Sequence, residues 1–96
     1  MTQIGILQIE LHLPAAQSLK EKRHVLKSLK DRLQAQFNLS VAEVGFLDKW
    51  QRAELAIVMV SADKNYLESQ FNHIKRFIDQ QIMGSAHVTH LDLQFI

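Results

Sequence analysis

The sequence predicts one α+β domain whose strands and helices follow the order βαββαβ. The chain has 96 residues, which is the size of a single domain with one hydrophobic core. Its first and last segments alternate apolar and polar residues, as strands with one buried face do. Two segments between them repeat apolar residues at helical spacing. Residues 1–96 are therefore expected to form one domain without a linker or an internal repeat.

The first strand is expected over residues 5–13, where every second residue is apolar or glycine. Pro14 ends it, because proline cannot donate to the strand ladder. Ser18 and Glu21 form a capping box, which predicts that the first helix begins there. The apolar face of this helix consists of Leu19, Leu26, Leu29, Leu33 and Phe37. Asn38 is expected to end it, since asparagine tolerates the left-handed conformation.

A second strand is expected over residues 41–47, and residues 48–52 connect it to a third strand over residues 53–61. The third strand is apolar on both faces, which is typical of a central strand. Asp63 or Asn65 can cap the second helix, whose apolar stripe is Leu67, Phe71, Ile74 and Ile78. Gly84 and Ser85 break the chain before a closing strand over residues 89–95.

This element order consists of two split βαβ units, the ferredoxin-like arrangement. Right-handed crossovers place both helices on one face of a four-stranded antiparallel sheet. The first and third strands are then central, which suits their apolar composition.

The composition favours a cytoplasmic protein. The absence of cysteine excludes disulfides, thiolate nucleophiles and cysteine-based metal sites. Neither a signal peptide nor an apolar stretch long enough to span a membrane is recognised, so no membrane partner is expected. The net charge of +1 conceals an asymmetry, because residues 18–36 carry six cations and only two acids.

The basic helix is the clearest functional candidate. At helical spacing, one stripe beside the apolar face contains Lys20, Arg23, Lys27 and Lys30. Such a stripe can follow a phosphate backbone, since lysine and arginine neutralise phosphates and release counterions. The alternative is an ordinary solvated helix face whose long side chains cover the edge of the core.

The second candidate is the connection over residues 48–52. It contains the only tryptophan of the chain, Trp50, with Lys49 before it and Arg52 after it. An exposed indole between cations can stack on a nucleobase or anchor a protein partner. The alternative is an indole folded over the end of the hairpin, where it shields the core.

A third candidate is the set Glu10, His12, His90 and Asp92, which point away from the apolar faces of the first and last strands. Glu10 and His90 are expected to be cross-strand partners, and imidazole with carboxylate can ligate a divalent metal. Their spacing matches no recognised metal motif, however, and exposed sheet faces routinely carry such polar pairs. No catalytic motif and no glycine-rich phosphate loop occurs either, so no catalytic residue, metal or cofactor is assigned.

Three blocks of the sequence resemble the bacterial YlxP-like family, a domain of unknown function. They are residues 18–29, residues 38–44 and residues 48–53. The resemblance implies a ferredoxin-like fold but little chemistry, since the family has no established activity. Members are often encoded beside translation and ribosome-maturation factors, so the resemblance implies the ribosome or structured RNA as a partner. The family blocks include Lys20, Glu21, Lys22, Arg23, Asp48, Trp50, Gln51 and Arg52.

Lys22 is the least expected of these residues, because it projects towards the apolar side of its helix between Leu19 and Leu26. It either extends its ammonium group to solvent or pairs with a carboxylate such as Glu43 or Asp48.

The leading functional hypothesis is a non-enzymatic module that docks on structured RNA or a ribosomal particle through the basic helix. The second is a homodimeric interaction or regulatory module, because the far face of the third strand is too apolar to be fully solvated. A small metal- or ligand-binding enzyme is the third.

Overall fold

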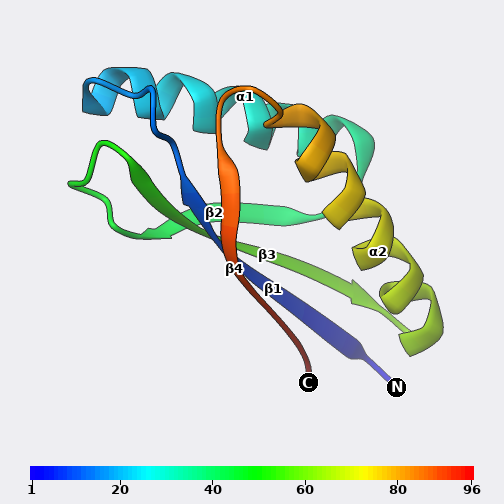
Figure 1. Cartoon of the computed structure of the whole chain (residues 1–96). Coiled ribbons are helices and arrows are strands. Elements are labelled where there is room, and N and C mark those ends of the chain that lie inside the picture. The colour runs from blue at the N-terminus through cyan, green and yellow to red at the C-terminus, as the bar shows by residue number, and fades with distance from the viewer.

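The computed structural model describes residues 1–96 and folds them into two layers, a sheet and a pair of helices (Figure 1). The strands are β1 (Gln3–His12), β2 (Ser40–Gly45), β3 (Arg52–Ser61) and β4 (His87–Phe95), and the helices are α1 (Leu19–Gln36) and α2 (Lys64–Gln81). Each strand boundary lies within two residues of the predicted one. The order βαββαβ is confirmed, and the fold is ferredoxin-like.

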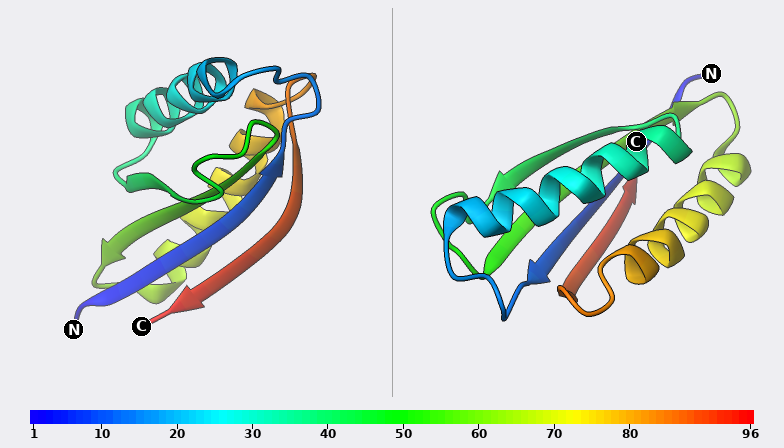
Figure 2. Two further views of the ribbon diagram at one scale, coloured as in Figure 1. Left: turned by 90° about the vertical axis from the view of Figure 1, so that its left-hand side faces the viewer. Right: turned by 90° about the horizontal axis from the view of Figure 1, so that it is seen from above.

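The sheet is antiparallel throughout and has the order β2-β3-β1-β4, so the prediction that β1 and β3 are central is confirmed. Both edge strands contain a bulge. Val44 is an extra residue of β2 opposite β3, and Thr89 is an extra residue of β4 opposite β1. Both helices cover the same face of the sheet and leave the other face open (Figure 2). The two termini lie close together, joined by backbone hydrogen bonds between Ile4 and Ile96.

The core fills the space between the sheet and the helices with a cluster of 18 buried apolar residues. The sheet contributes alternate residues of the central strands, chiefly Leu7, Ile9, Leu11, Leu55, Ile57 and Met59. The predicted stripes of the helices meet them, with Leu26, Leu29 and Leu33 from α1 and Leu67, Phe71, Ile74 and Ile78 from α2. Gly5 lies directly beneath Phe71, since a Cβ atom at this position would come within 2.3 Å of the ring. Only glycine fits there.

Both helices begin at a side-chain cap. The Ser18 hydroxyl accepts a hydrogen bond from the Glu21 amide at 3.1 Å, as the capping box predicts. The Glu21 carboxylate reaches one residue further back than in the usual box and accepts from the Gln17 amide. In α2 the cap is Asp63, which accepts from the Asn65 amide at 2.9 Å, so Asp63 is the correct choice of the two predicted caps.

The predicted helix end at Asn38 is wrong. α1 ends at Gln36, Phe37 is already extended, and Asn38 has no left-handed backbone. The extended conformation directs Phe37 and Leu39 to the same side, where both pack against the core. The Phe37 ring also meets Phe77 edge to face, with 5.6 Å between the ring centroids. This packing ends the helix without a left-handed residue.

The open face of the sheet is divided into an apolar half and a polar half. Near the chain termini, Ile4 lies opposite Val60 and Ile6 lies opposite Val58. At the other end the pairs are Glu10 with Glu54 and His12 with Arg52. Val60 is 63% exposed, so the apolar half is uncovered.

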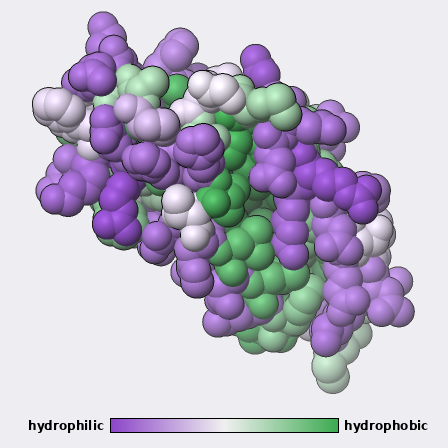
Figure 3. Space-filling model, viewed as in Figure 1, coloured by the Kyte–Doolittle hydropathy of each residue, from purple (hydrophilic) through white to green (hydrophobic).

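A further band of hydrophobic residues follows β4 between hydrophilic flanks (Figure 3). Leu91 is the most exposed of the β4 residues that face the helix layer. Neither helix has the length and apolar character needed to cross a membrane.

Candidate functional site

Lys22 anchors the first turn of α1 to the β2–β3 connection. Its side chain is fully buried, and its ammonium group lies 2.8 Å from Glu43 Oε2. It also donates to the carbonyl oxygens of Phe46 at 2.9 Å and Arg52 at 3.2 Å. The predicted pairing of Lys22 with Glu43 is therefore confirmed. The two alternatives, a pair with Asp48 and an ammonium group extended into solvent, are wrong. A buried ammonium with a full set of acceptors fixes the shape of the loop around it.

Gln51 forms a second anchor between the same connection and the segment that precedes α1. Its side-chain amide donates to the carbonyl oxygens of Pro14 at 3.1 Å and Ala16 at 3.2 Å. The backbone carbonyl of Gln51 accepts a hydrogen bond from the Leu13 amide at 2.9 Å. Gln51 thus joins two loops that are more than thirty residues apart in the sequence.

Together the two anchors bring the tip of the hairpin, residues 46–51, beside the N-terminal turn of α1. The figures show the same juxtaposition, with the β2–β3 connection and the start of α1 at one end of the molecule (Figures 1 and 2). We call this the basic end, and it consists of the tip with Lys20, Arg23 and Arg52. All three of these cations are exposed, as is Lys49 of the tip. The structure therefore brings the two predicted basic elements together.

Trp50 lies exposed in the tip. Its side chain is 54% accessible and does not belong to the core, so the interpretation of an indole shielding the hairpin end is wrong. The indole borders a shallow hollow of about 580 Å³ that opens on the surface. The other residues lining this hollow are His12, Gln17, Asp48, Lys49, Gln51 and Arg52. An exposed indole among cations is an arrangement typical of stacking platforms for nucleobases.

Arg52 is held where the tip joins β3. Its guanidinium carbon lies 3.8 Å from the centre of the Phe46 ring, and Nη2 lies 3.5 Å from Glu10 Oε2. Phe46 has a positive φ of 56°, which turns the chain at this point. The side chain of Arg52 nevertheless remains 55% exposed, so it retains donors for an external anion.

The predicted basic stripe of α1 is not uniform along the helix. Lys20 and Arg23 are exposed and form no ion pair, whereas Lys27 lies 2.8 Å from Asp31 Oδ2. This hydrogen bond raises the pKa of Lys27 above its ordinary value, and the charge of Asp31 adds to the effect. Lys30 lies a turn further on and is half-buried. Lys20 and Arg23, in the first two turns of α1, are therefore exposed and unpaired cations at the basic end.

The histidine–carboxylate set lies on the polar half of the open sheet face. Glu10 is opposite His90, which confirms the predicted cross-strand pairing, and Gln8 is opposite Asp92. The His12 and His87 rings lie 6.2 Å apart. No three metal-ligating side chains come close enough to hold one ion. The arrangement is a polar surface next to the basic end.

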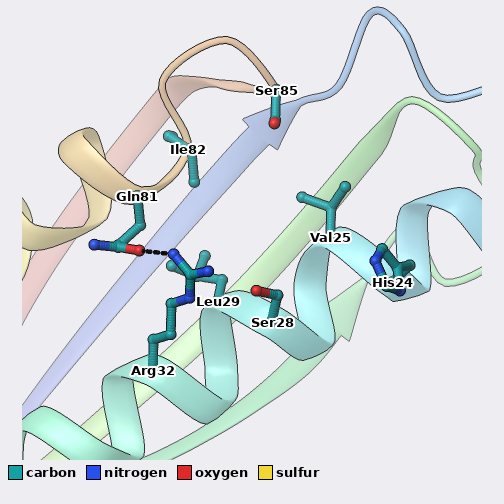
Figure 4. Close-up of a pocket in the computed structure, with 8 residues that line it drawn as sticks. All are labelled: His24, Val25, Ser28, Leu29, Arg32, Gln81, Ile82 and Ser85. Carbon is teal, nitrogen blue, oxygen red and sulfur yellow. Dashed lines mark hydrogen bonds between the residues drawn. The ribbon is translucent and has the colours of Figure 1, made fainter.

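A smaller cavity of about 230 Å³ separates α1 from the end of α2 (Figure 4). Arg32 spans its mouth and donates a hydrogen bond to Gln81 Oε1. The remaining lining residues are His24, Val25, Ser28, Leu29, Ile82 and Ser85. Arg32 is thus occupied in joining the two helices, and the cavity lies on the helix layer away from the hairpin tip.

Two functional features escape sequence reasoning. The Gln51 anchor cannot be found from the sequence, because its partners are backbone carbonyls of a loop that only the tertiary fold brings near. The left-handed Phe46 carries no local signal either, since phenylalanine is rare in that conformation. The only local signal is Gly45, the residue directly before Phe46, because a glycine within a strand pattern often marks a bulge or turn.

Solved structures with similar folds share little sequence with this chain. The de novo designed protein Foldit4 has a TM-score of 0.56 at 14% identity, with coverage of 100% of this chain and 97% of that chain. The Bacillus subtilis protein YXEP, a dinuclear metal-binding peptidase of the M20 family, has a TM-score of 0.62 at 13% identity. This chain matches only 26% of YXEP. At such identities the similarity supports the fold alone.

Sequence similarity identifies the family. The uncharacterized protein YlxP of Bacillus subtilis (strain 168) is 41% identical over 76 residues, which cover 79% of this chain and 83% of YlxP. The model of a protein family of unknown function, DUF503, matches residues 4–92. The matched range includes both anchors and the whole basic end. The chain therefore belongs to the DUF503 family, together with YlxP.

Proposed function

We propose that this protein is a non-enzymatic binding module that docks on structured RNA of a ribosomal particle through its basic end. The proposal includes a cytoplasmic location, with which a cysteine-free chain is compatible. Lys20, Arg23 and Arg52 contact phosphates, and the hairpin tip adds Lys49 and a stacking surface on Trp50. Contacts of this kind give affinity with little sequence specificity.

One observation carries the proposal, namely that a half-exposed Trp50 is held among exposed cations by two anchors, the buried Lys22 and the exposed Gln51. An indole in water usually turns onto the protein surface, because its burial is favourable. Here Lys22 and Gln51 fix the loop in a shape that keeps the indole accessible. A platform that is already ordered loses less conformational entropy when a base stacks on it.

The distribution of charge also favours a polyanionic partner. The exposed cations Lys20, Arg23, Lys49 and Arg52 come from two separate elements and gather at one end of the molecule. The net charge of the chain is only +1, so this concentration is local. A local cluster attracts phosphates although the remaining residues together carry a net negative charge.

The test is co-sedimentation of the purified protein with bacterial ribosomal subunits across a salt series. The charge-reversal variant is Lys20→Glu with Arg23→Glu, which avoids Lys27 because that lysine is paired with Asp31. Its matched control is Lys64→Glu with Arg76→Glu, which reverses two exposed cations of α2 away from the basic end. Circular dichroism and the urea midpoint check that both variants fold.

We expect the wild type and the α2 control to co-sediment at low salt and to dissociate as the salt concentration rises. The α1 variant should remain in the supernatant. If the wild type fails to sediment even at low salt, or if both variants bind equally well, the proposal is wrong.

A second candidate function follows from the open sheet face, whose exposed Val60 lies opposite Ile4. Pairing of two copies through this face would cover the apolar half of the sheet and give a homodimer. Sedimentation equilibrium of the wild type and of Val60→Glu tests it. A dimer that persists at high salt and is lost in the variant would support this candidate, whereas a monomer at all concentrations would exclude it.

A further inference from the structure

We propose that the hollow at the hairpin tip accepts one unpaired guanine of the bound RNA, with Trp50 stacking on the base and Asp48 reading its edge. This inference rests on the proposed function and names what the tip recognises. It assigns a role to Asp48, which neither anchor uses.

Asp48 is an unexpected residue in a phosphate-binding surface. It is exposed, and it belongs to none of the three ion pairs although Lys49 follows it directly. Its carboxylate also accepts none of the hydrogen bonds that fix the tip, which are those donated by Lys22 and Gln51. A turn-forming aspartate usually accepts from a backbone amide nearby, as Asp63 does at the start of α2. Asp48 thus forms no hydrogen bond or ion pair in the loop.

An unpaired carboxylate weakens binding to a polyanion unless it meets a hydrogen-bond donor on the ligand. In RNA such donors are the ribose 2′-hydroxyls and the base edges, and of these only the base edges differ between nucleotides. Unpaired bases expose their Watson–Crick edges to proteins. Guanine offers two adjacent donors on that edge, N1–H and N2–H, which match the two oxygens of a carboxylate. Adenine and cytosine offer a single amino group, and uracil a single N3–H.

The hollow supplies the other contacts that a base requires. Trp50 and Asp48 both line it, so one base can contact the indole with its face and the carboxylate with its edge. Its volume of about 580 Å³ is sufficient for a nucleobase and lies in the range usual for ligand sites, about 300–1,000 Å³. Lys49 and Arg52 on the rim are placed to neutralise the adjoining phosphates.

The chain contains one tryptophan, so its fluorescence reports directly on this site. The probes are hexaribonucleotides of uridine that carry one central guanosine, adenosine or cytidine. We expect the guanosine hexamer to quench Trp50 and to bind about tenfold more tightly than the adenosine hexamer, because a bidentate pair discriminates by about that factor. In Asp48→Asn the ratio should fall below about twofold while the adenosine hexamer binds at least as well. Asp79→Asn, which alters an exposed acid of α2, is the matched control and should keep the wild-type ratio.

The outcomes separate this inference from the proposed function. Equal binding of all hexamers, or no quenching while ribosomal subunits still co-sediment, overturns the guanine site and leaves docking intact. Free guanosine monophosphate that binds as tightly as the guanosine hexamer also overturns it, in favour of a mononucleotide site. A guanosine preference that persists in Asp48→Asn excludes Asp48 as its source. If neither the hexamers nor the subunits bind, the proposed function fails as well.

Discussion

The ammonium nitrogen of Lys22 lies 2.8 Å from Glu43 Oε2 in the interior between α1 and β2. Lys22 is fully buried, and the Glu43 side chain is 14% exposed. The two remaining ammonium protons have acceptors in the carbonyl oxygens of Phe46 and Arg52. One cation therefore satisfies a carboxylate and two backbone groups at once. Its removal would leave the Glu43 carboxylate and the Arg52 carbonyl without this donor, whereas the Phe46 carbonyl would still accept from the Lys49 amide at 3.0 Å.

Lys22→Met should destabilise the protein by about 3–5 kcal/mol, the usual effect of removing one partner from a buried ion pair. Urea unfolding followed by circular dichroism measures the loss. An unchanged midpoint would show that the pair does not hold the fold together. The double variant Lys22→Met with Glu43→Leu should recover part of the loss, because it removes the orphaned carboxylate but does not restore the hydrogen bond to the Arg52 carbonyl.

Gln51→Ala should lower the free energy of unfolding by about 1–2 kcal/mol, since it removes two hydrogen bonds to the loop before α1. It should also increase the mobility of Trp50, measured as a decrease in fluorescence anisotropy. Gln8→Ala is the control, because Gln8 is exposed on the open face of the sheet. Similar effects of the two substitutions would argue against the anchor.

Phe46→Gly should be more stable than Phe46→Ala by about 1 kcal/mol, although both remove the ring beneath Arg52. The two variants lose the same contacts, and only glycine adopts a φ of 56° without steric cost. Thermal unfolding of the pair isolates this backbone contribution. An alanine variant that is as stable as the glycine variant would contradict the left-handed turn.

Asp31→Asn should tighten binding to ribosomal subunits at low salt by about two- to fivefold, because it frees Lys27 and removes a negative charge. The effect should disappear as salt screens the exposed charges. The raised pKa of Lys27 means that its ammonium group keeps its charge at neutral pH and loses its proton only as the pH rises through that pKa. Binding of the wild type and of Asp31→Asn can therefore be compared at neutral pH. Unchanged or weaker binding of the variant would exclude Lys27 from the interface.

The sequence was sufficient to predict the elements and to name the Lys22–Glu43 pair as one of the alternatives for Lys22. Alternation in β1 and the helical stripes directly reflect which side of each element is buried, so they report the fold. Lys22 could be predicted to pair because a lysine between Leu19 and Leu26 must either reach solvent or find a carboxylate. Of the two carboxylates named for it, Glu43 and Asp48, the structure selects Glu43.

The features that escaped prediction depend on contacts between segments that are distant in the chain. α1 ends at Gln36 because Phe37 and Leu39 pack into the core, and no local property of Asn38 indicates this. The exposure of Trp50 follows from the anchors on either side of it rather than from the preference of an indole for burial. The geometry of the tip is therefore a property of the assembled fold.

The bulges in β2 and β4 affect how this small sheet behaves at high concentration. Each edge strand has an extra residue, Val44 in β2 and Thr89 in β4, which twists the strand locally and disturbs its row of backbone groups. A regular edge is a template on which a second chain can add its own strand, and repeated addition leads to fibrils. Because both edge strands are irregular, the protein can keep apolar residues on its open face without presenting an edge on which further chains add strands.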